Sequence, residues 1–216
     1  MNRGLVIVFE GIDGSGKSTL AKMLNDYING IGRSSIVETE PTSDTLVGKA
    51  LRDYLKNPQI DEATMALLFA ADRVEHVKKI KYWLDEGVDV ICDRYIYSTF
   101  AYQGEHPSRD IHNLLRDKFL TPDITFYIDG DPEICLERIK SRSNSLDKYE
   151  NVKKLETIRN NYQNLLSHSS LVYSYPKFSM DPFVIDKELS LEDSFKKIVE
   201  EYHKVEKAYR KSPRGL

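Results

Sequence analysis

Cysteine is scarce in this sequence, at two residues in 216. Cys92 falls at the end of a predicted strand and Cys135 within a predicted helix, where a cysteine more often fills a small buried space than forms a bridge. A disulfide framework is therefore not expected, and we expect the protein to work in a reducing compartment.

Long apolar runs and a strong charge of either sign are also missing. The apolar run Leu5 to Phe9 ends at Glu10, so it is too short for a signal sequence or a membrane span. We expect a cytoplasmic protein with no membrane contact. A net charge of -3, with 30% charged residues, gives no general attraction to nucleic acid. A polyanionic substrate must therefore be held by local cationic clusters.

The length suits a single α/β domain over residues 1–216, and no internal repeat is present. Strand-like runs alternate with helical patterns, which predicts a doubly wound five-stranded parallel sheet with helices on both faces. The strand-like runs are 5–9, 36–37, 88–92, 124–128 and 183–185. The helical patterns cover 17–31, 45–56, 62–86, 98–104, 108–119, 132–140, 149–168 and 190–209. Asp61 and Ser190 are expected to cap two helices, and Gly87 to end the longest.

A phosphate-binding loop pattern follows the first predicted strand and opens the first predicted helix. It has two glycines five positions apart, followed by Lys and Ser. Backbone N–H groups of such a loop surround a phosphate, Lys17 supplies a mobile cation, and the Ser18 hydroxyl can reach Mg²⁺. The sequence therefore predicts a nucleoside triphosphate site made of Gly11, Ile12, Asp13, Gly14, Ser15, Gly16, Lys17, Ser18 and Thr19.

Polar residues also follow other predicted strands, at the sheet edge where ligands of open α/β sheets bind. Asp93 is placed where phosphoryl-transfer enzymes keep the carboxylate that organises Mg²⁺. The alternative for Asp93 is a cap for the helix predicted at 98. Residues 129–131 read mainly as turn chemistry that starts a helix. Ser18 and Asp93 are thus the predicted metal ligands.

Several motifs of other nucleotide-binding classes are absent. The Asn-Lys-x-Asp string of GTP-binding switches does not occur, nor do the His-Arg-Asp and Asp-Phe-Gly strings of protein kinases. What remains is a small enzyme that moves a phosphoryl group from a triphosphate to a small acceptor.

Five sequence blocks resemble the thymidylate kinase family in order and spacing. They read FEGIDGSGKST at 9–19, EP at 40–41, LFAADR at 68–73 with His76, DRY at 93–95 with Ser98, and AYQG at 101–104. The resemblance runs from about residue 5 to 150 and continues more weakly to 185–186. It implies a homodimeric kinase of the nucleoside monophosphate kinase superfamily that transfers the γ-phosphoryl group of ATP to dTMP with Mg²⁺.

The resemblance implies that Phe69 and Arg73 hold the thymine. They lie four apart on a predicted helix and therefore share a face, where a ring and a guanidinium can stack on a pyrimidine and read its carbonyl. Read alone, Phe69 would be a core residue and Arg73 a surface partner of a nearby acid.

The resemblance further implies that Asp13 meets the 3′-hydroxyl of the acceptor sugar and that Arg94 grips the acceptor phosphate. The plain alternative for Arg94 is an ion pair with Asp93. The other residues implied for this pocket are Glu40, Pro41, Ser98, Tyr102 and Gln103. Tyr102 would crowd the 2′ position, although alone it reads as a half-buried helix tyrosine.

A cationic, Ser/Asn-rich segment at about 140–149 is predicted to be a small lid that closes over the transferring phosphates. One style of the family places Arg after the loop aspartate, and the other brings catalytic Arg from the lid. Gly14 stands at that position, so the lid style is implied. Arg142 is the candidate for the catalytic Arg of the lid, and Arg138 or Lys148 are the alternatives. A solvated basic loop is the alternative. Lys17, Arg94, Arg142 and Asp13 form the predicted catalytic set.

Two positions depart from the family pattern. Thr39 stands where many members have Arg before Glu-Pro, and Ser143 stands where many have Gly after the lid Arg. These departures bear on the acceptor-phosphate contacts and on the lid geometry.

Two other functions stay open from the sequence. One is a kinase for another nucleoside monophosphate or for a deoxynucleoside, and base selectivity separates it from the first reading. The other is a nucleotide-binding regulator that hydrolyses slowly or not at all.

Overall fold

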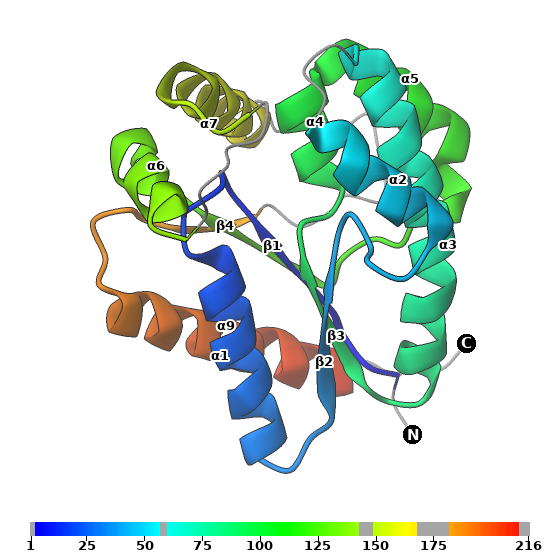
Figure 1. Cartoon of the computed structure of the whole chain (residues 1–216). Helices are drawn as coiled ribbons and strands as arrows, with labels where there is room; N and C mark the ends of the chain where they lie inside the picture. Colours follow the sequence, from blue (N-terminus) through cyan, green and yellow to red (C-terminus); the bar gives the residue numbers. More distant parts are fainter. Residues whose placement is uncertain (1–2, 57–59, 143–148, 168–181, 212–216) are drawn as a thin grey trace.

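Five parallel strands form one sheet in the order β2-β3-β1-β4-β5 (Figure 1). The computed structural model describes residues 3–56, 60–142, 149–167 and 182–211. The strands are β1 (Val6–Glu10), β2 (Ser35–Thr39), β3 (Asp89–Asp93), β4 (Ile124–Ile128) and β5 (Phe183–Ile185). The helices are α1 (Lys17–Gly30), α2 (Leu46–Leu55), α3 (Glu62–Asp85), α4 (Ile96–Gln103), α5 (Glu105–Leu115), α6 (Pro132–Lys140), α7 (Val152–Ser167) and α9 (Leu191–Lys211), with a 3-10 helix at Arg116–Lys118. The predicted five-stranded, doubly wound α/β fold is confirmed.

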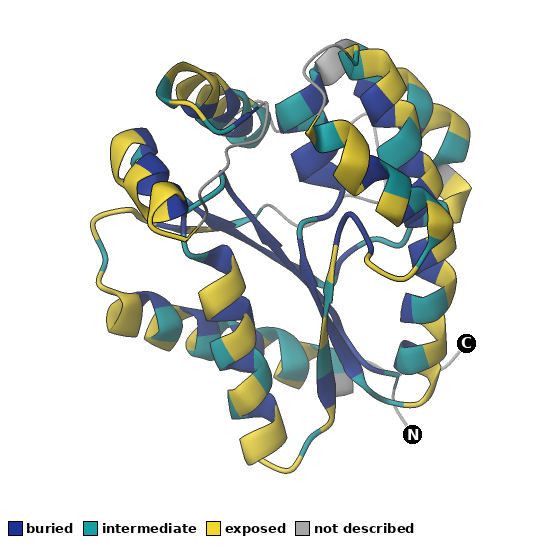
Figure 2. Ribbon diagram, in the orientation of Figure 1, coloured by how far each residue is buried: buried dark blue, intermediate teal, exposed yellow. Residues whose placement is uncertain are grey.

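The three central strands, β1, β3 and β4, are buried along their whole length (Figure 2). Side chains alternate between the two faces of a strand, so Ile7 and Phe9 enter one core while Val6 and Val8 enter another. Both faces of the sheet are therefore apolar and both need helices to cover them, which explains the unbroken apolar runs in the sequence.

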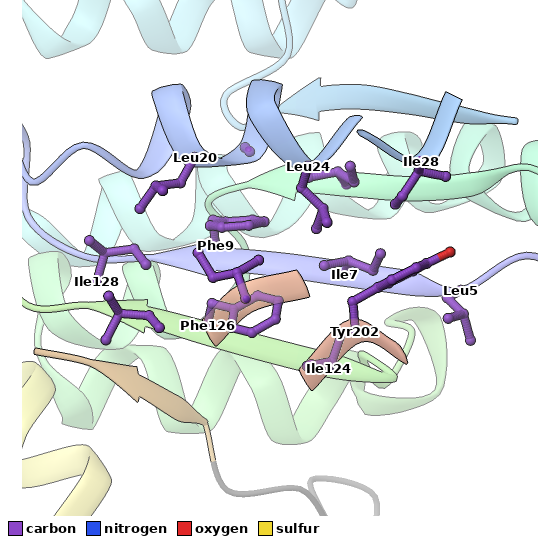
Figure 3. Close-up of a cluster of buried hydrophobic side chains, with 14 residues drawn as sticks. Leu5, Ile7, Phe9, Leu20, Leu24, Ile28, Ile124, Phe126, Ile128 and Tyr202 are labelled. Atoms are coloured by element: carbon purple, nitrogen blue, oxygen red, sulfur yellow. The ribbon is translucent and has the colours of Figure 1, made fainter. Parts of the chain in front are cut away.

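Helices α1 and α9 cover one face of the sheet. Leu20, Leu24 and Ile28, each four residues apart on α1, pack toward the strands, and Tyr202 of α9 joins them (Figure 3). The strand side chains of this core are Leu5, Ile7, Phe9, Ile91, Ile124, Phe126, Ile128 and Ile185. Burying each large apolar side chain contributes about 1.5 to 3 kcal/mol, so this core holds β1 and the start of α1 in place.

Helix α3 covers the opposite face, where Val77, Ile80 and Leu84 pack on the other side chains of β1 and β3. A third core lies at the carboxyl end of the sheet and joins α4, α6 and α7. It encloses Ile12 of the loop after β1, together with Cys135 of α6. The helices that flank the predicted lid are therefore packed against the phosphate loop itself.

The predicted helix caps are present. Asp61 accepts a hydrogen bond from the Thr64 N–H at 2.9 Å, and the Ser190 hydroxyl accepts one from the Asp193 N–H at 3.0 Å. Gly87 follows the end of α3 with a left-handed φ of 78°. Each cap satisfies a backbone group that a helix end leaves without a partner.

Several boundaries differ from the expected ones, most of them by one or two residues. β2 covers Ser35–Thr39 rather than 36–37, because it pairs along its whole length with β3. α5 begins at Glu105 rather than 108 and is followed by the 3-10 helix. α7 begins at Val152 rather than 149, where the Asn151 side chain accepts a hydrogen bond from the Lys154 N–H at 3.0 Å.

Cys92 and Cys135 are buried free thiols, one in β3 and one in α6. Among the described residues, no helix is both long and apolar enough to cross a membrane.

The packing of α1 on the sheet gives a prediction for stability. Leu24→Ala removes a fully buried side chain and should lower the free energy of unfolding by about 2 to 5 kcal/mol. Leu46→Ala is the matched control, because Leu46 is 85% exposed, and it should change stability by less than about 0.5 kcal/mol. Urea unfolding followed by circular dichroism measures both. Equal losses for the two variants would contradict the assigned core.

Candidate active site

The loop between β1 and α1 leaves backbone donors available at the start of α1. Gly16 is the N-cap residue of α1, with a left-handed φ of 100° and no side-chain cap. The first N–H groups of the helix therefore have no capping side chain, which is the arrangement that binds a phosphate. Lys17 is 5% exposed, and its Nζ donates to the Ile12 carbonyl at 3.2 Å and lies 3.6 Å from Asp13 Oδ1.

Gly14 is required at its position by the backbone of α6. It has a φ of 79°, and a Cβ there would lie 2.3 Å from the carbonyl oxygen of Cys135. No side chain fits without a shift of α6, so this loop cannot carry an Arg after Asp13 as it stands. Arg138, on the same helix, donates from Nη1 to the Gly14 carbonyl at 3.2 Å. A guanidinium is thus brought to the loop from the helix that leads into residues 140–149.

Ser18 and Asp93 lie together although they are 75 residues apart in the sequence. The Ser18 hydroxyl donates to Asp93 Oδ2, while Asp93 Oδ1 is buried and has no hydrogen-bond partner among the described residues. A hydroxyl beside a carboxylate oxygen that lacks a partner fits the oxygen ligands that Mg²⁺ prefers. The described residues contain no group of three acidic, His or Cys side chains that could hold a metal by themselves. A magnesium ion here would therefore take its other ligands from phosphate and water.

Arg94 occupies a backbone conformation that is rare for a residue with a side chain, with a φ of 75°. Its N–H donates to the Phe9 carbonyl at 2.9 Å, which ties the end of β3 to β1. The guanidinium donates to Asp13, to the Tyr102 hydroxyl at 2.7 Å and to the Ser98 hydroxyl at 3.0 Å. The plain alternative, a pair with Asp93, is not what the structure has.

The charges of this cluster change one another's pKa values. Burial acts to raise the pKa of Asp13, but the Arg94 and Lys17 cations outweigh it and hold that pKa well below its usual range. Burial and the nearby Arg94 lower the pKa of Lys17, against the effect of Asp13. Opposite charges are therefore already paired where a phosphate and a sugar hydroxyl would enter.

Glu10, at the end of β1, holds the residues that carry this cluster, and the sequence analysis did not predict it as a site residue. Its carboxylate accepts hydrogen bonds from the N–H groups of Tyr95 and Ser98 at 3.0 and 3.2 Å, and from the Ser98 and Tyr162 hydroxyls at 2.6 and 2.9 Å. Burial raises the pKa of Glu10, against these hydrogen bonds. The α4 helix consequently begins at Ile96 rather than at 98, and Asp93 does not cap it.

Arg73 is buried beside the same cavity, at 2% exposure. Its Nε donates to Glu40 Oε2 at 2.8 Å, and its Nη2 donates to the Tyr95 carbonyl at 3.0 Å and the Thr99 hydroxyl at 2.9 Å. The expected partnership with an acid is thus present, but inside the protein rather than on its surface. Phe69 is half-buried, one turn earlier on α3, and faces the same cavity.

One cavity of about 260 Å³ gathers the residues predicted for metal and acceptor binding. The predicted residues that line it are Asp13, Lys17, Ser18, Glu40, Pro41, Phe69, Arg73, Asp93, Arg94, Ser98, Tyr102 and Gln103. Thr39, the departure from the family pattern, also lines it, as does Arg52 of α2. Arg52 donates to the carbonyls of Pro41 and Thr42 at 2.5 and 3.3 Å, so it braces the loop after β2.

Tyr149 closes one side of this cavity and was missed by the sequence analysis. Its hydroxyl accepts from Gln103 Nε2 at 3.1 Å and donates to Glu62 at 2.6 Å. Its ring meets the Tyr102 ring edge-on at 5.3 Å. Nothing in the sequence pattern separates Tyr149 from a core tyrosine, since its role depends on a contact with a helix 46 residues away.

A second cavity of about 350 Å³ lies along the other part of the phosphate loop. It is lined by Ser15, Gly16 and Thr19, by the ends of β4 and β5, and by Arg138 and Arg142. Asp131 at its edge caps α6, in line with the turn chemistry expected for residues 129–131. Arg142 therefore faces this second cavity, while residues 143–148 of the expected lid, with Ser143 and Lys148, lie outside the described residues.

The comparison with known proteins agrees with this geometry. The family model described as thymidylate kinase matches residues 9–178. A thymidylate kinase from Trichodesmium erythraeum is 37% identical over 194 residues, which cover 78% of this chain and 86% of that protein. A thymidylate kinase from Leptospira borgpetersenii is 37% identical over 176 residues, covering 79% and 85%.

The solved structures agree as well. The thymidylate kinase of Candida albicans superposes with a TM-score of 0.73 at 26% identity, over 94% of this chain and 93% of that one. The match of a family model to most of the chain, with relatives of this identity and coverage, shows that the chain belongs to the thymidylate kinase family.

Proposed function

We propose that this protein transfers the γ-phosphoryl group of ATP to dTMP, giving dTDP and ADP. The observation that carries the proposal is the pair of cavities that share one phosphate loop. The first has a half-buried ring and a fixed guanidinium, which suit a pyrimidine, and a second guanidinium beside the loop, which suits its phosphate. The second cavity suits the donor nucleotide.

The acceptor is aligned by the residues of the first cavity. Phe69 stacks on the thymine, Arg73 donates to its carbonyl, and Arg94 grips the phosphate. Asp13 accepts from the 3′-hydroxyl of the sugar, while Tyr102 leaves no room for a hydroxyl at the 2′ position. Ser98, Gln103 and Pro41 complete the wall. Support comes from their common cavity and from the contacts of Asp13 with Arg94 and Tyr102. Holding the acceptor in line lowers the entropic part of the barrier.

Glu40 acts through Arg73 rather than on the substrate itself, because both of its carboxylate oxygens are bound by protein. This refines the role that the resemblance implied for it.

The donor phosphates lie in the loop formed by residues 11–19. Backbone N–H groups at the start of α1 and the Lys17 ammonium hold them, and Ser18 and Asp93 hold Mg²⁺. When bound, the metal neutralises charge on the phosphate oxygens. The unpartnered Asp93 Oδ1 supports this assignment.

Charge that develops on the transferring group is stabilised by cations already near it. Lys17 and Arg94 come from the loop and the end of β3, and Arg142 comes from the lid segment. The packing of α6 on Gly14 supports the lid style, because it leaves no space for an Arg side chain in the loop. Preorganised cations of this kind carry most of the catalysis in phosphoryl transfer.

We further propose one kinase domain with a lid at about 140–149, working as a homodimer in the cytoplasm. Exposed apolar side chains on the outer helices support association, among them Leu67 at 55% and Leu114 at 81% exposure. The two free, buried thiols support a reducing compartment. Sedimentation equilibrium measures the oligomeric state, and a monomer at micromolar concentration would contradict the proposed homodimer.

The activity is tested by incubating the protein with ATP and Mg²⁺ against a panel of nucleoside monophosphates and deoxynucleosides. We expect dTDP as the main product, and no product from Lys17→Met, which removes a cation without touching the core. A preference for another acceptor would favour the broader kinase class. ADP release that does not depend on any acceptor would favour a regulator.

Phe69 gives a prediction for acceptor affinity. Phe69→Ala should weaken dTMP binding by about 1 to 3 kcal/mol, because the base loses its stacking partner, and should leave ATP binding unchanged. Tyr82→Ala on the same helix is the control, since it also removes an aromatic ring but Tyr82 is 58% exposed and does not line the cavity. Isothermal titration calorimetry measures both nucleotides. Weakened ATP with unchanged dTMP would mean that the two cavities are assigned the wrong way round.

Tyr102 gives a prediction for sugar selectivity. Tyr102→Ala should raise the rate on the ribonucleotide acceptor relative to dTMP, because the ring no longer fills the space at the 2′ position. Tyr102→Phe keeps the ring and loses only the hydroxyl that meets Asp13 and Arg94, so it should keep the selectivity. The ratio of kcat/KM values decides, and an unchanged ratio in Tyr102→Ala would return this residue to a packing role.

Arg142 gives a prediction for the chemical step. Arg142→Ala should lower kcat by about 100-fold or more with little change in the KM for dTMP, as expected for a contact made mainly in the transition state. Arg142→Lys should recover part of the rate, because it keeps the charge but not the planar fork. Arg138→Ala, measured in parallel, shows whether the role belongs to that residue instead. An unchanged kcat in Arg142→Ala would exclude Arg142 as the residue that stabilises the transition state.

A further inference from the structure

His76 is buried behind the acceptor cavity and does not line it. It lies on α3 one turn after Arg73 and is 1% exposed. Its Nδ1 is 3.1 Å from Glu40 Oε1, while Arg73 Nε donates to the opposite oxygen, Glu40 Oε2, at 2.8 Å. One carboxylate therefore joins the two α3 side chains, and each holds one of its oxygens.

The geometry leaves Arg73 a single free edge. Nε and Nη2 are occupied by Glu40, the Tyr95 carbonyl and the Thr99 hydroxyl. Among the described residues none accepts from Nη1, and Arg73 lines the cavity. Nη1 is thus the donor left for a ligand, and its direction is set by the plane in which Glu40 holds the guanidinium.

Glu40 is the least constrained member of this arrangement, because it lies in the loop after β2 and not in a helix or strand. Its N–H donates to the Asp93 carbonyl at 3.1 Å, and the next residues are fixed by Asp72, which accepts from Thr42 N–H at 2.8 Å. Within the part of the chain that the structure describes, the side chain itself has Arg73 and His76 as its partners. Without His76, Oε1 would be buried with no donor, and the carboxylate would be free to rotate away from Arg73.

A row of alternating charges continues beyond His76. Its Nε2 lies 3.5 Å from Glu38 without a well-aligned hydrogen bond, and Glu38 pairs with Lys79 at 3.0 Å. Lys79 in turn pairs with Asp44 at 3.1 Å. Burial alone would lower the pKa of His76, but Glu38 and Glu40 outweigh it and raise the pKa to about 9. His76 is therefore an imidazolium at neutral pH.

We propose that His76 is a positioning residue for pyrimidine recognition, which fixes Glu40 so that Glu40 holds Arg73 with Nη1 directed at a base carbonyl. The inference rests on the proposed function. Thymine has a carbonyl at position 4 where cytosine has an amino group, so a guanidinium donor fixed there favours thymine and repels cytosine. His76 thus contributes to base choice without touching the base.

The test compares His76→Leu, which removes both ring nitrogens, with His76→Asn, whose amide can replace Nδ1 as a donor to Glu40. For His76→Leu we expect the KM for dTMP to rise about tenfold, with kcat changed less than threefold, the KM for ATP unchanged and the dTMP over dCMP ratio of kcat/KM lowered. His76→Asn should recover most of the ratio. Lys79→Met is the control, since it cuts only the outer, half-exposed part of the row.

The outcomes separate this inference from the proposed function. If the wild-type protein does not prefer dTMP, the proposed function fails whatever the variants do. If it does prefer dTMP, the positioning role is overturned by an unchanged KM for dTMP and an unchanged dTMP over dCMP ratio in His76→Leu. It is also overturned if the KM values for dTMP and ATP change equally in all His76 variants. Should His76→Leu not fold, the comparison is made between His76→Asn and His76→Gln. The longer Gln side chain points its amide toward Glu38 and not Glu40. The Asn variant must then have the higher dTMP over dCMP ratio of kcat/KM.

The charge on His76 is tested by stability against pH. The groups that contact it are Glu38 on β2 and Glu40 in the loop after β2. Arg73 lies on the other oxygen of Glu40, and Lys79 joins Glu38 to Asp44. A pKa of about 9 in the folded protein, against an ordinary value near 6.5, means that the stabilisation is complete below pH 6.5 and is lost as the pH rises through 9.

The stability advantage of wild type over His76→Asn in urea should therefore shrink between pH 6.5 and 9.5. Taking this difference cancels the groups that titrate in both proteins. An advantage that stays constant from pH 6 to 10 would contradict a charged His76.

Discussion

The left-handed backbone of Arg94, at the point where β3 ends, is the constraint on which the site depends. Its N–H donates to the Phe9 carbonyl of β1, and the Glu10 carboxylate accepts from the N–H groups of Tyr95, the N-cap residue of α4, and of Ser98 in the first turn of that helix. The chain therefore turns sharply and aims the guanidinium back at the phosphate loop, where it meets Asp13 and Tyr102. A conformation that costs about 1 to 3 kcal/mol persists because the surrounding contacts determine it.

The site is built from charges that neutralise one another before any substrate arrives. Asp13 lies between Arg94 and Lys17, and Glu40 lies between Arg73 and His76. In the proposed reaction these two clusters behave differently. The acceptor phosphate and the sugar hydroxyl replace contacts within the first cluster. The second cluster keeps its contacts and offers Arg73 Nη1 as a donor to the base. A preformed, buried arrangement of this kind limits reorganisation during phosphoryl transfer.

The sequence predicted the sheet, the phosphate loop and the joining of distant blocks at one edge, because apolar periodicity and strand ends determine these features. Ser18 and Asp93 are the clearest instance, since they touch as expected for residues that follow two neighbouring strands. Glu10, His76 and Tyr149 were not predicted as site residues. Each is a buried polar side chain whose partners come from other elements, and a linear pattern does not distinguish such a residue from one that fills the core. The predicted start of α4 was wrong for the same reason, because the carboxylate that binds its first turn belongs to β1, whereas the starts of α1, α3 and α6 were predicted correctly.

The most direct test of this account is a crystal structure with dTMP, Mg²⁺ and a non-hydrolysable ATP analogue. We predict the acceptor phosphate within about 3 Å of Arg94, the thymine between Phe69 and Arg73 Nη1, and the triphosphate in the loop of residues 11–19 with its base in the second cavity. The Arg73–Glu40–His76 contacts should be unchanged. Binding of dTMP in the second cavity, or an acceptor phosphate held away from Arg94 while Arg94 stays with Asp13, would contradict the account.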